Sequence, residues 1–191
     1  MIQKSGLVWD TKMMFHRYIE DCGIACEHVT PHMLAAPFYR GRYVTLVIPT
    51  GFGNPSYSGL LPALRASSGR IRRFVENGGN LLVFGAAADK NDPYDWLPFR
   101  VVYRHQYQAR RVQVEPTHPC AGIIEDFDPE SIECDGFFPE HEGCVVAYSE
   151  GLPVAISHKV GKGSVLVTCI HEYPSRCFIS YFCSAEGETL F

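Results

Sequence analysis

The sequence YVTLVI at residues 43–48 decides the fold. It is a continuous apolar run rich in β-branched side chains, which is typical of a strand buried on both faces of a parallel sheet. The loop PTGFGN follows at residues 49–54, then a helical pattern over residues 60–77, and then a second apolar run, NLLVF, at residues 80–84. A helix between two buried strands indicates a parallel sheet with helices covering its faces.

Periodic apolar patterns extend this arrangement toward the N-terminus. Residues 5–9 and 24–29 are expected to form strands with a helix over residues 12–21 between them, and residues 31–41 a loop or a short helix. The Ser-Ser-Gly sequence at residues 67–69 leaves open whether the helix that precedes NLLVF is one piece or two.

Shorter strands are expected in the second half of the chain, where Pro, Gly and acidic turns separate the apolar runs. They cover residues 101–103, 111–114, 143–148, 154–158 and 164–170, and a last helix covers residues 174–185. Gly161-Lys162-Gly163 lies between the last two strands and predicts an antiparallel hairpin. The predicted fold class is α/β, an open, mostly parallel, doubly wound sheet with an antiparallel C-terminal hairpin.

Length and charge exclude several classes of protein. A chain of 191 residues is expected to form a single domain, residues 1–191. Its 17 basic and 21 acidic side chains give a formal charge of −4, which argues against a dedicated nucleic-acid-binding protein. No apolar run is long enough for a membrane span, and the N-terminal residues lack the apolar stretch of a signal peptide. We therefore expect a cytoplasmic protein with no membrane association.

Eight cysteines in a chain without an export signal are expected to be reduced thiols. Most are interpreted as small buried hydrophobic side chains. Cys134, His141 and Cys144 have the residue types of a metal site without the close spacing of a zinc knuckle, and no CxxC pair occurs. We expect no bound metal and no cofactor, while a metal-dependent protein built on these three residues remains an alternative.

Four sequence segments in this order resemble the class I glutamine amidotransferase-like superfamily. They are YVTLVI with PTGFGN at residues 43–54, IRRFVENGGNLLVFG at 71–85, PVAISHKVGKGSVLVTCIH at 153–171, and the pair His171-Glu172. The resemblance covers nearly the whole chain and implies a flavodoxin-like layout. Fold alone does not establish function.

Catalytic members of that superfamily carry a nucleophilic cysteine in a sharp turn, of form G-x-C-x-G, after the strand corresponding to NLLVF. Here the elbow segment, residues 85–89, reads Gly-Ala-Ala-Ala-Asp, and Ala87 stands where the cysteine would be. Covalent hydrolysis of glutamine needs a thiolate or hydroxyl paired with a base, and the elbow segment contains no Cys, Ser or Thr. The resemblance therefore implies a member without glutaminase activity.

The rest of the family's pocket is partly retained. Gly51, Gly53 and Asn54 occupy the place of a glycine loop whose backbone N–H groups form an oxyanion hole, and such groups also hold carboxylates or phosphates. The alternative is a tight turn after a strand. His171 matches the catalytic histidine, but Glu172 comes one position early and is expected to point away from it. The predicted ligand-binding residues are Gly51, Gly53, Asn54, Ala87, His171 and Glu172.

Two other groups of residues are candidates for binding. Asp10 follows the first strand and is expected either to cap a helix or to face a ligand. Two clusters consist of arginines, one at Arg65, Arg70, Arg72 and Arg73 and the other at Arg100, Arg104, Arg110 and Arg111. A third cluster is aromatic and consists of Tyr94, Trp96, Phe99, Tyr103 and Tyr107. Such arginine runs are usually solvated, or they dock an acidic partner. The aromatic segment, residues 92–107, is expected to form a lid over the pocket or an interface in a homodimer or larger complex.

These observations leave two main functions open. The first is a non-catalytic domain that binds a small anionic ligand or a protein partner through the former active-site pocket. The second is a hydrolase or transferase in which His171 acts as base and water or Cys169 as nucleophile, which requires His171 to lie within hydrogen-bonding distance of that nucleophile.

Overall fold

The computed structural model describes residues 3–185 and 187–191. Within these ranges the main sheet has eight strands in the order β2-β1-β4-β5-β11-β10-β9-β7. The strands are β1 (Lys4–Val8), β2 (Ala25–Val29), β3 (Arg42–Tyr43), β4 (Thr45–Ile48), β5 (Asn80–Val83), β6 (Val101–Arg110), β7 (Gln113–Val114), β8 (Ile132–His141), β9 (Cys144–Ser149), β10 (Leu152–Val160), β11 (Gly163–Thr168) and β12 (Thr189–Leu190). The helices are α1 (Met14–Asp21), α2 (Pro31–Ala35), α3 (Leu60–Glu76), α4 (Arg176–Phe182) and the 3-10 helix η1 (Ala121–Ile124).

The first five strands in this order are parallel, which confirms the predicted α/β class with a mostly parallel sheet. Leu46 of β4 pairs with Leu81 of β5, and Leu82 pairs with Leu166 of β11. All four leucines are fully buried. These strands read as continuous apolar runs because helices cover both of their faces.

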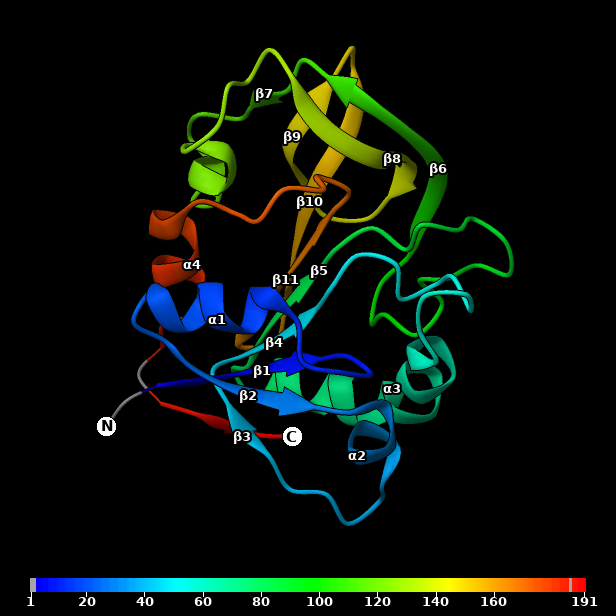
Figure 1. Ribbon diagram of the computed structural model, residues 1–191, viewed down its shortest axis with the longest axis vertical. Helices are drawn as coiled ribbons and strands as arrows, with labels where there is room; N and C mark the ends of the chain where they lie inside the picture. The colour runs from blue at the N-terminus through cyan, green and yellow to red at the C-terminus, as the bar shows by residue number, and fades with distance from the viewer. Residues whose placement is uncertain (1–2, 186) are drawn as a thin grey trace.

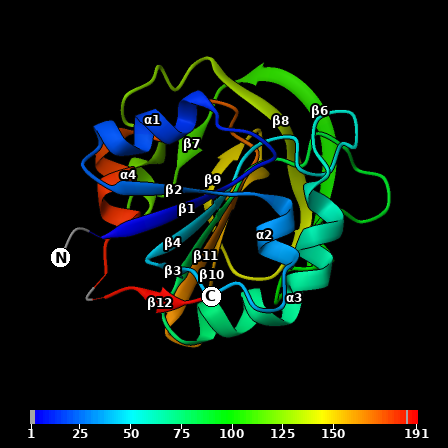
Figure 2. The same cartoon turned by 60° about the horizontal axis from the view of Figure 1, so that its bottom comes forward.

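Helices α1 and α4 lie on one side of the sheet, and α2 and α3 lie on the other (Figure 2). Helix α3 runs unbroken through residues 67–69, so the break that we considered there does not occur. The Ser67 hydroxyl is buried and donates to the carbonyl oxygen of Leu34 (2.9 Å), which joins α3 to α2. A packed serine at this position does not interrupt the helix. None of the helices in the described ranges has the length and apolar character needed to cross a membrane.

The predicted hairpin is present between β10 and β11, with Ala155 paired to Thr168 and Val160 to Gly163. Its turn requires glycine at residue 161, which has φ +59°. A Cβ there would lie 2.6 Å from the backbone oxygen of Glu76 at the end of α3. The turn is therefore packed against the helix as well as sharply bent.

A second antiparallel ribbon, formed by β6 and β8, corrects the sequence analysis. We expected a strand only at residues 101–103, but β6 has ten residues, and the equally long β8 was not expected at all. In Figure 1 the ribbon arches over one end of the molecule, where β8 contacts β10. The central residues of β6 are exposed and polar, so this strand lacks the apolar pattern of a buried one.

The aromatic segment contributes most of its aromatic side chains to the hydrophobic core. Tyr94 and Trp96 are 1% and 2% exposed, and both make edge-to-face contacts with Phe52 of the glycine loop. The Trp96 indole donates to the carbonyl oxygen of Pro93 (2.9 Å). Only Tyr107 among the five aromatic residues named above is exposed. The segment therefore extends the hydrophobic core, and the interface that we inferred from its composition loses its basis.

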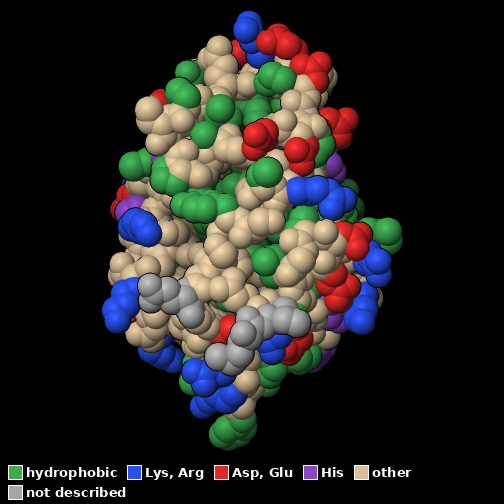
Figure 3. Space-filling model, turned by 90° about the vertical axis from the view of Figure 1, so that its left-hand side faces the viewer, with side chains coloured by type: hydrophobic (Ala, Val, Ile, Leu, Met, Phe, Trp, Pro, Cys, Tyr) green, Lys and Arg blue, Asp and Glu red, His purple; other side chains and the backbone are tan. Residues whose placement is uncertain are grey.

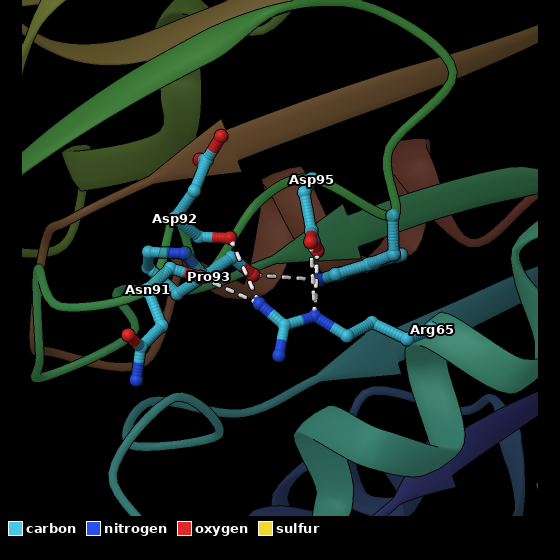
Figure 4. Close-up of polar contacts among 6 residues, drawn as sticks. Arg65, Asn91, Asp92, Pro93 and Asp95 are labelled. Carbon is cyan, nitrogen blue, oxygen red and sulfur yellow. Dashed lines mark hydrogen bonds and ion pairs between the residues drawn. The ribbon is translucent and has the colours of Figure 1, made fainter.

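Arginines of α3 hold the aromatic segment in place. Arg65 forms an ion pair with Asp95 (2.8 Å) and donates to the carbonyl oxygens of Asn91 and Asp92 (Figure 4). Arg72 donates to the carbonyl oxygen of Pro98 (3.4 Å). These cations thus bind backbone carbonyls that a loop leaves without strand or helix partners.

The second arginine cluster is also used within the chain. Arg100 pairs with Glu140 and Arg111 with Glu130, and Arg110 is 5% exposed with its guanidinium over the Phe137 ring. On the face seen in Figure 3, basic side chains occur singly or in small groups among acidic ones. That face therefore has no continuous basic surface of the kind that binds nucleic acid.

Candidate functional site

A cavity of about 810 Å³ opens where the parallel strands β1, β4 and β5 end. Ligands of open α/β sheets bind at this edge, outside the carboxyl ends of the strands. The cavity is lined by Trp9, Met13, Phe15, Pro49, Thr50, Gly51, Asn54, Ser56, Tyr57, Phe84, Ala87, His105, Tyr107, Asp135, His171 and Tyr173.

Four of the six predicted ligand-binding residues line this cavity: Gly51, Asn54, Ala87 and His171. Gly53 does not, because the loop turns inward there and a Cβ on Gly53 would lie 2.8 Å from the Ala86 side chain. The sixth, Glu172, also points elsewhere. The structure thus brings together residues from three segments that are distant in the sequence.

The glycine loop does not present free amides, so the predicted oxyanion-type cradle is wrong at these positions. The Gly51 N–H donates to the carbonyl oxygen of Gly85 (2.8 Å), and the Gly53 N–H donates to that of Ala86 (3.0 Å). The Asn54 N–H donates to the carbonyl oxygen of Gly51 (3.0 Å). Of the two interpretations, the tight turn is the one observed, and the turn also braces the elbow segment.

The elbow segment is sharply bent at Ala87. Ala87 has φ +52°, a conformation that residues other than glycine seldom adopt. The Asn54 side-chain amide lies 3.5 Å from the Ala87 carbonyl oxygen. No helix follows within residues 85–99, all of which are described, so this turn leads into the aromatic segment. A sharp bend with an alanine at its tip cannot supply a nucleophile.

Asp135 on β8 was missed by the sequence analysis. It is 2% exposed and lines the cavity, and within the described part of the chain neither carboxyl oxygen has a hydrogen-bond partner. The Tyr103 hydroxyl instead donates to the Asp135 backbone carbonyl (2.9 Å), and His105 Nδ1 lies 2.7 Å from the same oxygen. Burial raises the pKa of Asp135 to about 7, and the nearby Tyr103 hydroxyl and Ala87 amide offset this only in part.

The Asp135 carboxyl lies directly against Gly85, the first residue of the elbow segment. A Cβ on Gly85 would overlap both carboxyl oxygens. Only glycine therefore fits at residue 85 beside Asp135, because any side chain there would occupy the position of the carboxyl group.

Gly85→Ala is expected to lower the free energy of unfolding by about 1–3 kcal/mol, as overpacking usually does. Adding Asp135→Ala should restore most of the loss, since the double variant removes the overlap. Urea denaturation of the single and double variants measures both values. Gly69→Ala is the matched control, because Gly69 lies within α3 with open space around it. A Gly85→Ala protein as stable as the wild type would show that the carboxyl lies elsewhere.

Among the described residues, the His171 ring has no hydrogen-bond partner that would orient it as a base. Its ring packs edge-on against Tyr107, with centroids 5.6 Å apart, and its backbone N–H donates to the carbonyl oxygen of Glu133 (2.7 Å). Glu172 accepts from the Glu133 N–H (2.9 Å) and so points away from the imidazole, as the register predicted. Cys169 is fully buried and its thiol donates to the carbonyl oxygen of Gly136 (2.7 Å), so it does not reach the cavity as a nucleophile.

Two further candidate sites do not form among the described residues. Asp10 accepts from the Ser58 hydroxyl and the Gly59 N–H ahead of α3, and α1 has no side-chain cap, so Asp10 supports a different helix from the one expected. Cys134 is fully buried while Cys144 is exposed. In the described residues, no three His, Cys, Asp or Glu side chains are placed to hold a metal ion.

The electrostatic character of the cavity follows from its lining. Six of its lining residues are aromatic and one is an aspartate. Lys and Arg are absent from the described residues that line it. An anionic ligand would therefore face a buried carboxyl without a compensating cation.

Comparisons with known proteins find no matching family model and no matching curated protein. Similar solved structures include a β-galactosidase from Bacillus circulans sp. alkalophilus, with a TM-score of 0.56, 12% identity, and coverage of 93% of this chain and 30% of that one. A cytoplasmic protein from Salmonella typhimurium LT2 has a TM-score of 0.55 and 16% identity, with 94% of each chain covered. An exo-β-1,4-mannosidase from Opitutaceae bacterium strain TAV5 has a TM-score of 0.54 and 13% identity, with 95% and 32% covered.

The chain thus spans about 30% of the length of the glycoside hydrolases and nearly all of the Salmonella protein. At these identities the likeness concerns the fold alone. The chain has a mixed α/β fold with a mostly parallel sheet, which recurs both within longer enzymes and as most of a shorter protein.

Proposed function

We propose that this chain is a non-catalytic domain of the class I glutamine amidotransferase-like type that binds a small ligand in the cavity at the elbow segment. The observation that carries the proposal is Ala87, which lines the cavity at the bend where a nucleophile would stand. The order β2-β1-β4-β5-β11 of the five parallel strands supports the assignment, because numbering these five strands alone in chain order gives the flavodoxin-like order 2-1-3-4-5.

The size and composition of the cavity support small-molecule binding. Its volume of about 810 Å³ falls within the usual range of ligand pockets. Aromatic walls with a few polar groups, here Asn54, Thr50 and the two histidines, are also typical of such pockets. Association with a second copy or another protein stays a prediction, which the burial of the aromatic segment no longer supports.

Narrowing the mouth of the cavity tests the proposal. Ser56 lines the cavity and is exposed, so Ser56→Trp should obstruct it without disturbing the core. Ser131→Trp is the matched control, because Ser131 is exposed and does not line the cavity. Ligands from a library of small aromatic amines, alcohols and acids should raise the Tm of the wild type and of Ser131→Trp but not of Ser56→Trp. Equal stabilisation of all three proteins would place the binding elsewhere.

Ala87→Cys is expected to leave glutamine hydrolysis at the buffer rate. The new thiol would lack an oriented base, because Glu172 points away from His171, and would lack free glycine-loop amides to stabilise an oxyanion. Glutamate release from glutamine, measured on wild type, Ala87→Cys and Ala87→Gly, checks this. Release by Ala87→Cys alone, well above the blank, would show that the catalytic machinery is intact apart from its nucleophile.

A hydrolase that activates water is the second candidate. It is favoured by Asp135, whose pKa of about 7 suits a general acid or base, and by the position of His171 in the same cavity. Turnover of p-nitrophenyl acetate or of p-nitrophenyl glycosides that is lost in Asp135→Asn would establish it in place of a binding domain.

A further inference from the structure

We infer that the cavity selects ligands with a protonated nitrogen that carries N–H groups, an ammonium or amidinium, held by the Asp135 carboxylate among aromatic rings. This inference rests on the proposed function, since it names the ligand class of the same cavity. It replaces the anionic ligand expected from the glycine loop.

The first support is the unpaired carboxyl. Asp135 is 2% exposed, lines the cavity, and accepts no hydrogen bond from the described residues at either oxygen. A buried carboxylate is costly unless a cation or several donors accompany it, and no lysine or arginine of the described lining supplies one. A ligand ammonium would provide both the charge and the N–H donors.

The groups around Asp135 do not supply a positive charge either. Burial raises the pKa values of Tyr94, Tyr103 and the Cys169 thiol, and the nearby Asp135 charge raises them further, so all three groups are neutral near pH 7. His105 directs Nδ1 at the Asp135 backbone carbonyl rather than at the carboxyl. Among the described residues, none of these groups thus places a cation beside the carboxyl.

The aromatic lining is the second, independent support. Trp9, Tyr57, Tyr107 and Tyr173 line the cavity, and Tyr57 and Tyr107 are 64% and 52% exposed near its mouth. Aromatic faces attract cations, most strongly where water is excluded. A sugar would also stack on these rings and donate hydroxyls, but it would leave the carboxylate charge uncompensated.

A matched pair of ligands tests the inference. Tryptamine and its neutral analogue tryptophol share an indole and differ in the terminal group, an ammonium or a hydroxyl. Isothermal titration at about pH 8, where Asp135 is ionised and the alkyl ammonium is protonated, should show tryptamine binding at least about tenfold more tightly, as expected for a charge-assisted hydrogen bond. Asp135→Asn should abolish this preference, and Asp89→Asn, which changes an exposed aspartate, should keep it.

The pH dependence gives a second readout that needs no variant. Tryptamine affinity should fall as the pH drops through about 7, because the Asp135 carboxyl takes up a proton. The ammonium or amidinium ligand class would be wrong if tryptophol bound as tightly as tryptamine, if galactose bound in preference to tryptamine, or if Asp135→Asn kept the preference for tryptamine. The cavity would still be a binding site in each of these cases. The proposed function itself is wrong if no compound of the amine, alcohol and acid library raises the Tm of Ser131→Trp more than that of Ser56→Trp.

Discussion

Trp96→Ala is expected to lower the free energy of unfolding by about 3–5 kcal/mol, as truncation of a buried tryptophan does. Trp96 is 2% exposed, its ring meets Phe52 edge-on, and its indole N–H is bonded to the Pro93 carbonyl. The substitution therefore removes packing against the glycine loop and leaves a carbonyl oxygen without its donor. Chemical denaturation of wild type and variant measures the loss.

The same substitution separates a core role from an interface role. A core residue changes stability and leaves the molar mass of the folded protein unaltered, which light scattering under native conditions reports. Tyr107→Ala serves as the comparison, because Tyr107 belongs to the same segment but is 52% exposed. Tyr107→Ala should lower the free energy of unfolding by less than about 1 kcal/mol. A Trp96→Ala protein of normal stability that dissociates from a larger species would restore the interface interpretation.

Asp135→Asn is expected to raise the free energy of unfolding above neutral pH, by as much as about 4 kcal/mol. The folded-state pKa of Asp135 is about 7, against an unfolded value of about 3.9. Between these values the unfolded chain loses the proton while the folded chain keeps it, so wild-type stability falls as the pH rises through this window. Each unit of difference corresponds to about 1.4 kcal/mol.

The sign of this effect is specific to a carboxyl whose pKa is raised. Below about pH 4 both states of the wild type are protonated, and the advantage of the variant should disappear. Urea denaturation at about pH 4 and about pH 8 measures how the stability difference between Asp135→Asn and the wild type changes with pH. The exposed aspartate variant Asp89→Asn is the control. A variant that is less stable than the wild type at the higher pH would mean that the ionised carboxylate has a stabilising partner.

The centre of the parallel sheet could be predicted because β4, β5 and β11 are largely continuous apolar runs. YVTLVI and NLLVF are buried on both faces, so composition alone distinguishes them from loops. Strand β6 could not be identified in this way, because residues 104–109 of that strand are exposed and, apart from Tyr107 and Ala109, polar. A ribbon held by backbone pairing and by contacts on one face leaves a weak pattern in the sequence.

Long-range contacts explain what was wrong or missed at the site. The amides of Gly51 and Gly53 bind the carbonyls of Gly85 and Ala86, residues more than thirty positions further along the chain. Asp135 reaches the cavity only because β8 pairs with β6 and its N–H donates to the Cys169 carbonyl (2.8 Å). An aspartate within the run ECDGFF at residues 133–138 is an unusual polar residue among apolar ones, and that is the signal that could have singled it out.

Protein-observed NMR gives the most direct test of the cavity as a binding site. With ¹⁵N-labelled protein and the library of small aromatic amines, alcohols and acids, the shifted signals should cluster at the Trp9 indole N–H and at the amides of Ala87, His105 and His171, all of which line the cavity. A second cavity of about 640 Å³, lined in part by His118 and Tyr181, provides the internal comparison. Shifts confined to that second cavity, or no shifts from any compound, would contradict a ligand-binding role for the cavity at the elbow segment.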